Sequence, residues 1–168
     1  IDYLTASNRK GFGDTVPDFD AGLLNAEGKR VVVIGGGDTA MDCVRTAIRQ
    51  GAASVKCLYR RDRANMPGSD REVANAEEEG VEFQWLSAPK GFLGDNHVTG
   101  VIASRMRLGP PDLTGRQMPE EIPGADETLE ADLVVKALGF EPEDVPALWG
   151  VPELEVTRWG TIRTQHPS

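Results

Sequence analysis

The sequence predicts an α/β fold in which a parallel βαβ sheet carries an appended antiparallel β-meander. Three observations predict it. An apolar run at residues 30–34 leads into three consecutive glycines, and a segment with helical periodicity follows them. A second apolar run, at 54–59, comes directly after that segment, and later segments alternate between apolar and polar residues as antiparallel strands do. Strand, glycine turn, helix and strand in this order are typical of a Rossmann-like dinucleotide-binding unit.

The first strand and the first long helix follow from local composition. Residues 30–34 are β-branched and apolar after the first position, as expected of a central parallel strand covered on both faces. Apolar residues then recur at helical spacing between positions 40 and 48, with charged residues on the opposite side. Gly51 stands where a left-handed C-terminal cap belongs, and the second strand follows it. We expect a right-handed crossover between the two strands.

The next helix has a start signal and a stop signal of its own. Ser69 and Glu72 have the S-x-x-E spacing of a capping box, which predicts a helix from this point to Gly80. Alternating apolar residues at 81–85 then predict a third strand with one buried face.

The second half of the chain predicts the meander. Residues 97–109 and 129–139 have the composition of strands, and a turn at 94–96 precedes the first of them. Between the two strands, residues 110–125 are polar and rich in proline, so we expect a loop there.

Composition and charge exclude several classes of function. A formal net charge of −9 argues against a nucleic-acid partner, because a phosphate backbone would be repelled. The sequence has no apolar run long enough for a membrane span and no leader that argues for secretion. Cys43 and Cys57 fit neither a redox C-x-x-C pair nor a metal-ligand set, so we expect buried thiols in a reduced, cytoplasmic compartment. His97 and His166 lie far apart, and we assign them no metal or catalytic role.

The glycine turn after the first strand carries the G-x-G-x-x-A pattern. In such a turn Gly35 permits a tight exit from the strand, Gly37 lets a diphosphate approach the backbone, and Ala40 lets the helix pack closely. The helix N-terminus offers free N–H groups to the phosphates. We expect Asp38 to be the N-cap and Thr39 to add a hydroxyl contact; the alternative is a glycine turn needed only for chain geometry. The predicted cofactor-binding residues of the turn are Gly35, Gly36, Gly37, Asp38, Thr39 and Ala40.

Two arginines at the end of the second strand predict the cofactor. An enzyme that prefers NAD usually has an acidic residue there, which bonds the ribose 2′-hydroxyl. This sequence has Arg60 and Arg61, whose planar guanidinium groups suit a 2′-phosphate, so NADP(H) is favoured. Arg63 is a third candidate. The alternative is that the arginines are surface charges paired with Asp62 or Asp70, and Asp62 also leaves room for NAD.

No catalytic constellation emerges from the sequence. A Ser/His/Asp set, a carboxylate pair or a metal cluster with credible spacing is missing. Hydride transfer between a nicotinamide and a flavin needs no dedicated acid or base, because the cofactors carry the chemistry. The chain has one glycine motif of this kind, so FAD is not expected to bind here by the same device.

Two longer stretches add a family resemblance. The stretch YRRDRANMPGSDREVANAEEEGV (59–81), together with the glycine turn, resembles the NADPH-binding domain of the small subunit of bacterial glutamate synthase, and ADLVVKALGFEP (131–142) matches the segment that returns toward that family's FAD domain. The resemblance spans about residues 1–165. It implies a two-dinucleotide-binding flavoprotein in which NADPH reduces FAD, and 4Fe-4S clusters pass the electrons to a large subunit that makes glutamate.

The resemblance also implies a domain organisation. Residues 1–28 would be an irregular linker from an FAD domain, 29–140 the NADPH-binding domain, and 141–168 the return segment. The chain opens at Ile1 rather than Met, and we expect it to be part of a longer polypeptide whose other segments bind FAD and the clusters.

The resemblance also implies roles for those residues of this sequence that match the family's motifs. Gly35, Gly37 and Ala40 match the family's dinucleotide fingerprint, and Arg60 and Arg61 match its 2′-phosphate pair. The turn that lies near the nicotinamide or the flavin in such enzymes corresponds to Ala137, Leu138 and Gly139, although an ordinary strand end is the alternative.

Other functions are alternatives to the glutamate synthase assignment, and one of them is excluded on chemical grounds. Thioredoxin reductase shares the architecture but needs a C-x-x-C pair, which this sequence lacks. Ferredoxin-type reductases and the electron-entry domain of dihydropyrimidine dehydrogenase keep the same NADPH module. A non-catalytic NADP(H) sensor is the alternative from another functional class.

Overall fold

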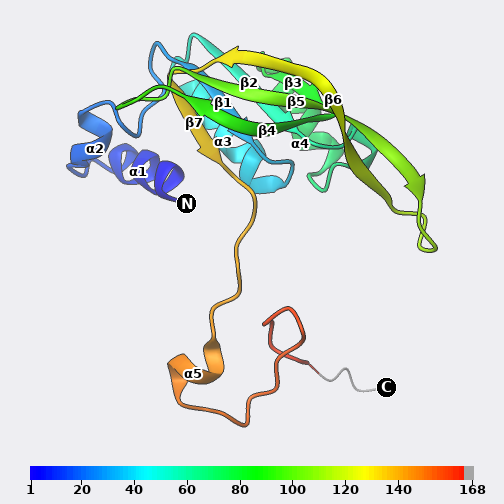
Figure 1. Ribbon diagram of the computed structural model, residues 1–168. Helices are drawn as coiled ribbons and strands as arrows, with labels where there is room; N and C mark the ends of the chain where they lie inside the picture. Colours follow the sequence, from blue (N-terminus) through cyan, green and yellow to red (C-terminus); the bar gives the residue numbers. More distant parts are fainter. Residues whose placement is uncertain (165–168) are drawn as a thin grey trace. The chain divides into compact units, whose positions relative to one another are not determined.

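A computed structural model describes residues 1–164, and the chain divides into two compact units, Ile1–Leu138 and Gly139–Ser168. The elements of the first unit are connected as Figure 1 shows. In chain order they are α1 (Asp2–Gly11), α2 (Pro17–Asp20), β1 (Arg30–Ile34), α3 (Asp38–Arg49), β2 (Ser54–Tyr59), the 3-10 turn η1 (Arg63–Asn65), α4 (Asp70–Glu78), β3 (Glu82–Trp85), β4 (Ser87–Leu93), β5 (Gly100–Pro111), β6 (Gln117–Glu130) and β7 (Leu133–Lys136).

A four-stranded parallel sheet in the order β3-β2-β1-β7 lies at the centre of the first unit. The predicted bounds of β1 and β2 are confirmed, and the two strands pair in parallel from Arg30 opposite Ser54 to Ile34 opposite Leu58. Gly51 has the left-handed φ of 82° expected at the end of α3. The predicted α/β fold with an added antiparallel sheet is therefore confirmed.

The second sheet is antiparallel and has the order β4-β5-β6, but two expectations about it are wrong. Residues 110–125 are not a loop, because β5 and β6 continue through most of this range and only a short turn separates them. Pro119 and Pro123 are tolerated because β6 is an edge strand, where a missing N–H breaks no inner ladder, and Pro110 and Pro111 stand at the very end of β5, beside the turn. The apolar residues at 133–136 form β7, which joins the parallel sheet beside β1, and β4 was not predicted.

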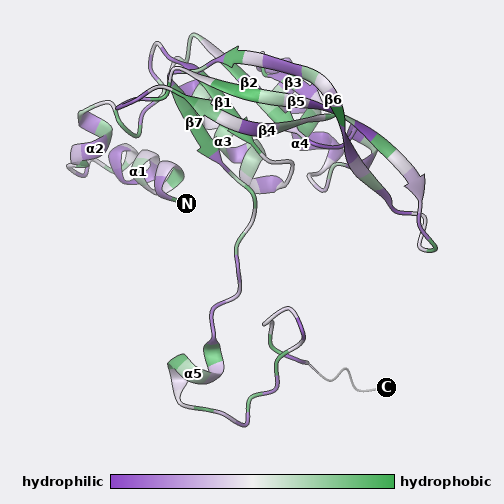
Figure 2. Ribbon diagram, in the orientation of Figure 1, coloured by the Kyte–Doolittle hydropathy of each residue, from purple (hydrophilic) through white to green (hydrophobic). Residues whose placement is uncertain are grey.

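The two faces of the parallel sheet are covered by different layers. Val31 and Val33 on β1 contact buried residues of α1, α3 and α4, whereas Val32 and Ile34 contact the antiparallel sheet through residues such as Val101. Figure 2 shows the hydrophobic colour following the central strands, while the helices display both colours. Burial on both faces explains the unbroken apolar sequence of β1.

Residues 1–28 were expected to be irregular, and this expectation is wrong, because they contain α1 and α2. Tyr3 is buried in the helix-side core, and its hydroxyl donates a hydrogen bond of 3.0 Å to Gln50 Oε1 at the end of α3. The same oxygen accepts the backbone N–H of Ala26 at 2.8 Å. The packing of Tyr3 against α3 supplies the apolar contact that stabilises α1.

The second unit is small and has no core of its own among its described residues. Residues 139–164 include α5 (Val145–Trp149) and an antiparallel bridge between Val156 and Ile162, and none of their side chains is buried. Its large apolar side chains are exposed, Trp149 and Trp159 among them. Across residues 1–164, none of the helices combines the length and the hydropathy that crossing a bilayer requires.

Candidate dinucleotide-binding site

The three glycines after β1 occupy three different environments. Gly35 has a φ of 147°, and a Cβ at this position would lie 2.2 Å from the carbonyl oxygen of Ala137. A Cβ at Gly36 would lie 2.5 Å from the ring of Tyr59, whereas a Cβ at Gly37 would meet no atom within 4 Å. Gly35 and Gly36 are therefore required by the protein's own packing, and Gly37 borders open space.

The open space lies at the N-terminus of α3. Gly37 is the N-cap, and no side chain from the part of the chain that the structure describes caps this end. Helix N-termini present N–H groups and a partial positive charge, which stabilise anions. Ala40 is fully buried in the helix-side core and brings α3 close to the sheet, as predicted.

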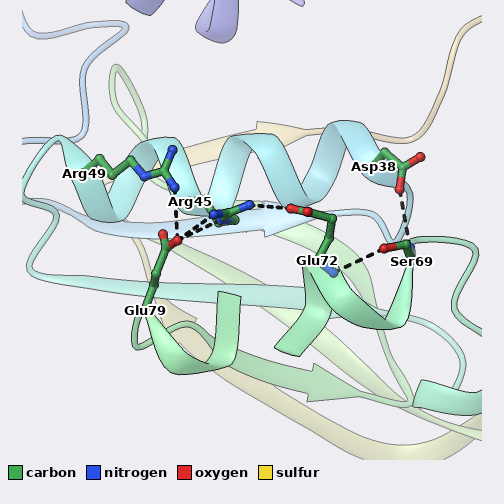
Figure 3. Close-up of polar contacts among 6 residues, drawn as sticks. All are labelled: Asp38, Arg45, Arg49, Ser69, Glu72 and Glu79. Atoms are coloured by element: carbon green, nitrogen blue, oxygen red, sulfur yellow. Dashed lines mark hydrogen bonds and ion pairs between the residues drawn. The ribbon is translucent and has the colours of Figure 1, made fainter. Parts of the chain in front are cut away.

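Asp38 does not cap α3, so that prediction is wrong. It is the first residue of the helix, and its Oδ1 accepts the backbone N–H of Ser69 at 3.4 Å (Figure 3). The carboxylate therefore connects the N-terminus of α3 to that of α4. Thr39 is the second residue of α3, and its predicted hydroxyl contact with a phosphate stays a prediction.

The predicted capping box of α4 forms only in part. Ser69 Oγ accepts the N–H of Glu72 at 3.3 Å, but the Glu72 carboxylate pairs with Arg45 on α3 instead of the Ser69 N–H (Figure 3). Arg45 also contacts Glu79 at 2.8 Å, and Arg49 bonds the same carboxylate at 3.1 Å. These bonds hold the pKa of Glu79 below its usual value, and the hydrogen bond from Arg45 is the largest cause. Ionic contacts therefore fix α4 alongside α3.

The two arginines after β2 have no carboxylate partner in residues 1–164. Arg60 is exposed, and the half-buried Arg61 donates from Nη2 to Asn65 Oδ1 at 2.6 Å. Neither pairs with Asp62, whose Oδ1 accepts from Asn65 instead. Arg63, the third candidate, donates to both carboxylate oxygens of Glu77 at 2.8 Å and so is already engaged.

The segment that follows Arg61 folds back onto the glycine turn. Gly68 N–H donates to the carbonyl oxygen of Gly36 at 2.8 Å, and the Tyr59 hydroxyl donates to the carbonyl oxygen of Asn65 at 2.9 Å. The same Tyr59 ring lies against Gly36. These contacts bring the arginine pair and the N-terminus of α3 into one local structure. Sequence reasoning missed Tyr59, Asn65 and Gly68, because no spacing rule marks a loop that returns to a turn.

The third predicted segment, residues 137–139, begins beside the glycine turn. Ala137 N–H donates to the carbonyl oxygen of Ile34 at 2.8 Å, and its own carbonyl faces Gly35. Leu138 is exposed and ends the first unit, while Gly139 opens the second with a φ of 97°. A role of these residues near a nicotinamide or flavin stays a prediction.

The remaining candidates for chemistry are buried, exposed or outside the described range. Both cysteines are buried, as predicted, and burial raises the pKa of Cys57 to about 12. Its thiol contacts the carbonyl oxygen of Gly35 at 3.4 Å. His97 is exposed, and His166 lies outside the described residues. Residues 1–164 contain no group of three or more side chains that could hold a metal ion.

Comparison with known proteins assigns this architecture to a family. A family model of pyridine nucleotide-disulphide oxidoreductases matches residues 5–167. The chain belongs to this family. The range that matches the pyridine nucleotide-disulphide oxidoreductases contains both the glycine turn and the arginine pair.

The resemblance to glutamate synthase small subunits is also confirmed. A Cereibacter sphaeroides protein whose name provisionally assigns it to the glutamate synthase (NADPH) small chains is 74% identical over 163 residues, which are 97% of this chain and 39% of that protein. The glutamate synthase (NADPH) small chain of Azospirillum brasilense is 68% identical over 166 residues, which are 99% of this chain and 34% of that protein. The chain therefore spans little more than a third of the length of these relatives.

A solved structure shares the fold at low sequence identity. Mycobacterium tuberculosis FprA in complex with NADPH superimposes with a TM-score of 0.64 at 18% identity, over 77% of this chain and 43% of that chain. At this identity the match supports the fold alone.

Proposed function

We propose that this chain is the NADPH-binding module of a glutamate synthase small chain, which presents NADPH to a flavin. The observation that carries the proposal is the pairing of an uncapped helix N-terminus with two arginines that have no carboxylate partner in residues 1–164. The two groups are held together by the Gly68–Gly36 and Tyr59–Asn65 contacts. A diphosphate and a 2′-phosphate on one ligand would match this arrangement.

The diphosphate would lie against the N-terminus of α3. The open space at Gly37 removes the side chain that would otherwise separate an anion from the backbone. The N–H groups of the first turn of α3 would donate to the phosphate oxygens. The buried Ala40 keeps the helix close to the sheet, which fixes the direction of these N–H groups.

The 2′-phosphate would be recognised by Arg60 and Arg61. Guanidinium groups donate paired hydrogen bonds to phosphate oxygens, and a charge without an intramolecular partner needs no ion pair broken before it binds. Arg63 differs, because its bonds to Glu77 compete with any ligand. The selectivity for NADPH over NADH would therefore come from two of the three arginines.

A bound NADPH would supply the hydride that reduces a flavin, and the protein's part is to bind and orient the cofactor. The matched range contains one glycine motif of this kind, so FAD, the 4Fe-4S clusters and the contact with a large subunit would involve other parts of a longer protein. The length of the relatives, of which this chain spans 34–39%, supports that division.

A second candidate keeps the module and changes the electron acceptor. The beta subunit of the NADPH-Fe(3+) oxidoreductase of Geobacter sulfurreducens is 42% identical over 162 residues, 94% of this chain and 24% of that protein. This identity is well below that of the glutamate synthase small chains, which favours the first candidate.

Isothermal titration of the 168-residue chain with NADPH and with NADH tests the proposal. One additional charge-assisted hydrogen bond is worth roughly 1.5–3 kcal/mol, so NADPH should bind at least about tenfold more tightly than NADH. Because phosphate recognition is electrostatic, the preference should decrease as salt is added. Equal dissociation constants for the two cofactors, or no binding of either, would refute the proposal.

A further inference from the structure

Asn65 uses all of its polar groups, and each contact fixes part of the arginine loop. Its backbone N–H and its side-chain Nδ2 both donate to Asp62 Oδ1, at 3.0 and 2.7 Å. Its carbonyl oxygen accepts the Tyr59 hydroxyl at 2.9 Å. The remaining oxygen, Oδ1, accepts from Arg61 Nη2 at 2.6 Å. The Asn65 side chain, which accepts from Arg61, is therefore itself fixed by Asp62.

Arg61 depends on this single side-chain contact. Its carbonyl oxygen accepts the N–H of Leu86 at 3.0 Å, and this bond fixes its backbone. Its guanidinium group makes no ion pair with the described residues, and its buried Nε has no hydrogen-bond partner among them. Without Asn65 the group would rotate among the several rotamers that a long side chain adopts.

The amide holds the guanidinium group without neutralising it. Because Nδ2 of Asn65 donates to Asp62, the oxygen of the amide must face Arg61, so the orientation of Asn65 follows from its partners. A carboxylate at position 65 would offer the guanidinium an acceptor, but it would lose the donor to Asp62 and would cancel the positive charge that a phosphate needs. Asp62 also directs its Oδ1 toward Asn65 and away from an ion pair with Arg61.

We propose that Asn65 is a positioning residue for cofactor selectivity, which fixes Arg61 in place as a charged donor for the 2′-phosphate through the Asp62–Asn65–Arg61 chain of contacts. The inference rests on the proposed NADPH-binding function and assigns a determinant of its selectivity outside the arginine pair. Asn65 acts through Arg61 and does not itself contact the cofactor.

The test compares NADPH and NADH dissociation constants in the full chain for wild type, Asn65→Ala, Arg61→Ala and the double variant. Asn65→Ala should reduce the NADPH:NADH affinity ratio by roughly three- to tenfold, which corresponds to the free energy of about one hydrogen bond. The affinity for NADH should stay unchanged. In the Arg61→Ala background the same change should not alter the ratio further, because a residue that acts through Arg61 has nothing left to position.

Asn65→Asp is a second variant, nearly identical in shape to the wild type, that keeps the test valid if the alanine variant folds poorly. It keeps an acceptor for Arg61, but it removes the donor to Asp62 and adds a negative charge, so its affinity ratio should fall at least as far as that of Asn65→Ala. An unchanged ratio in folded Asn65→Asp, or an equal loss with and without Arg61, would overturn the inference. A wild-type chain without NADPH preference would instead refute the proposed function, so the two failures are distinguishable.

Discussion

Replacing Gly37 by alanine should weaken the binding of NADPH but leave the stability of the fold almost unchanged. Gly37 has a φ of −93° and a ψ of 179°, which alanine adopts without strain, and a Cβ there would meet no atom within 4 Å. The folded chain should therefore accept the methyl group. A diphosphate that approaches the N-terminus of α3 would meet this methyl group directly.

The two magnitudes are estimated from this geometry. Alanine is a poorer N-cap than glycine by about 0.5–1 kcal/mol. The same change reduces the freedom of the unfolded chain, which stabilises the fold by about 0.4–1 kcal/mol. The free energy of unfolding should thus change by less than about 0.5 kcal/mol, whereas the NADPH dissociation constant should rise at least about tenfold, or about 1.4 kcal/mol.

Urea denaturation and isothermal titration measure the two quantities separately. Gly35→Ala is the contrasting variant, since its φ of 147° and the carbonyl oxygen 2.2 Å from a Cβ predict a loss of stability of more than about 1 kcal/mol. If Gly37→Ala remains folded and binds NADPH as tightly as the wild type, the diphosphate does not lie at this turn.

Three further predictions concern charge. Arg61→Ala should weaken NADPH binding by roughly 1.5–3 kcal/mol and leave NADH binding unchanged, while the control Arg63→Ala should alter neither in titrations, because Glu77 already engages Arg63. The bonds from Arg45 lower the pKa of Glu79, so they stabilise the fold above the unfolded pKa of about 4.5, and this stabilisation is lost as the pH falls through the lower folded value. The free energy of unfolding should then fall more between pH 7 and pH 3 in wild type than in Arg45→Met, and equal losses would contradict the assignment. The pKa of the Cys57 thiol is about 12 because it is buried, so an aromatic disulfide reagent at pH 8 should label it far more slowly in the native chain than in urea; equal rates would show that the thiol is accessible.

Local patterns were sufficient for the elements that carry the site. The unbroken apolar strand β1, the helical stripe of α3 and the cap at Gly51 each depend on neighbouring residues, so the sequence predicted their positions closely. Residues 110–125 were misread because proline usually argues against a strand, whereas most of this range pairs in the β5–β6 hairpin, with Pro119 and Pro123 on the edge strand β6. The helix α1 was missed because its packing partner, α3, lies far along the chain.

The candidate site, like the fold, was predictable only where short sequence patterns mark it. The glycine motif and the arginine pair are short patterns with a known mechanism, so the sequence marked both as candidates. Asp38 was misassigned as a cap because its partner, Ser69, comes from another helix. Asn65 was not found, although its partners Tyr59, Arg61 and Asp62 lie within six residues of it, because no short motif assigns an asparagine at this spacing to an arginine.

The most direct test of the central claim is a crystal structure of the chain bound to NADP⁺. The diphosphate oxygens should lie about 3 Å from the backbone N–H groups at the start of α3, and the 2′-phosphate about 3 Å from the guanidinium groups of Arg60 or Arg61. A cofactor bound elsewhere, with the space at Gly37 filled by the protein's own side chains, would contradict the account.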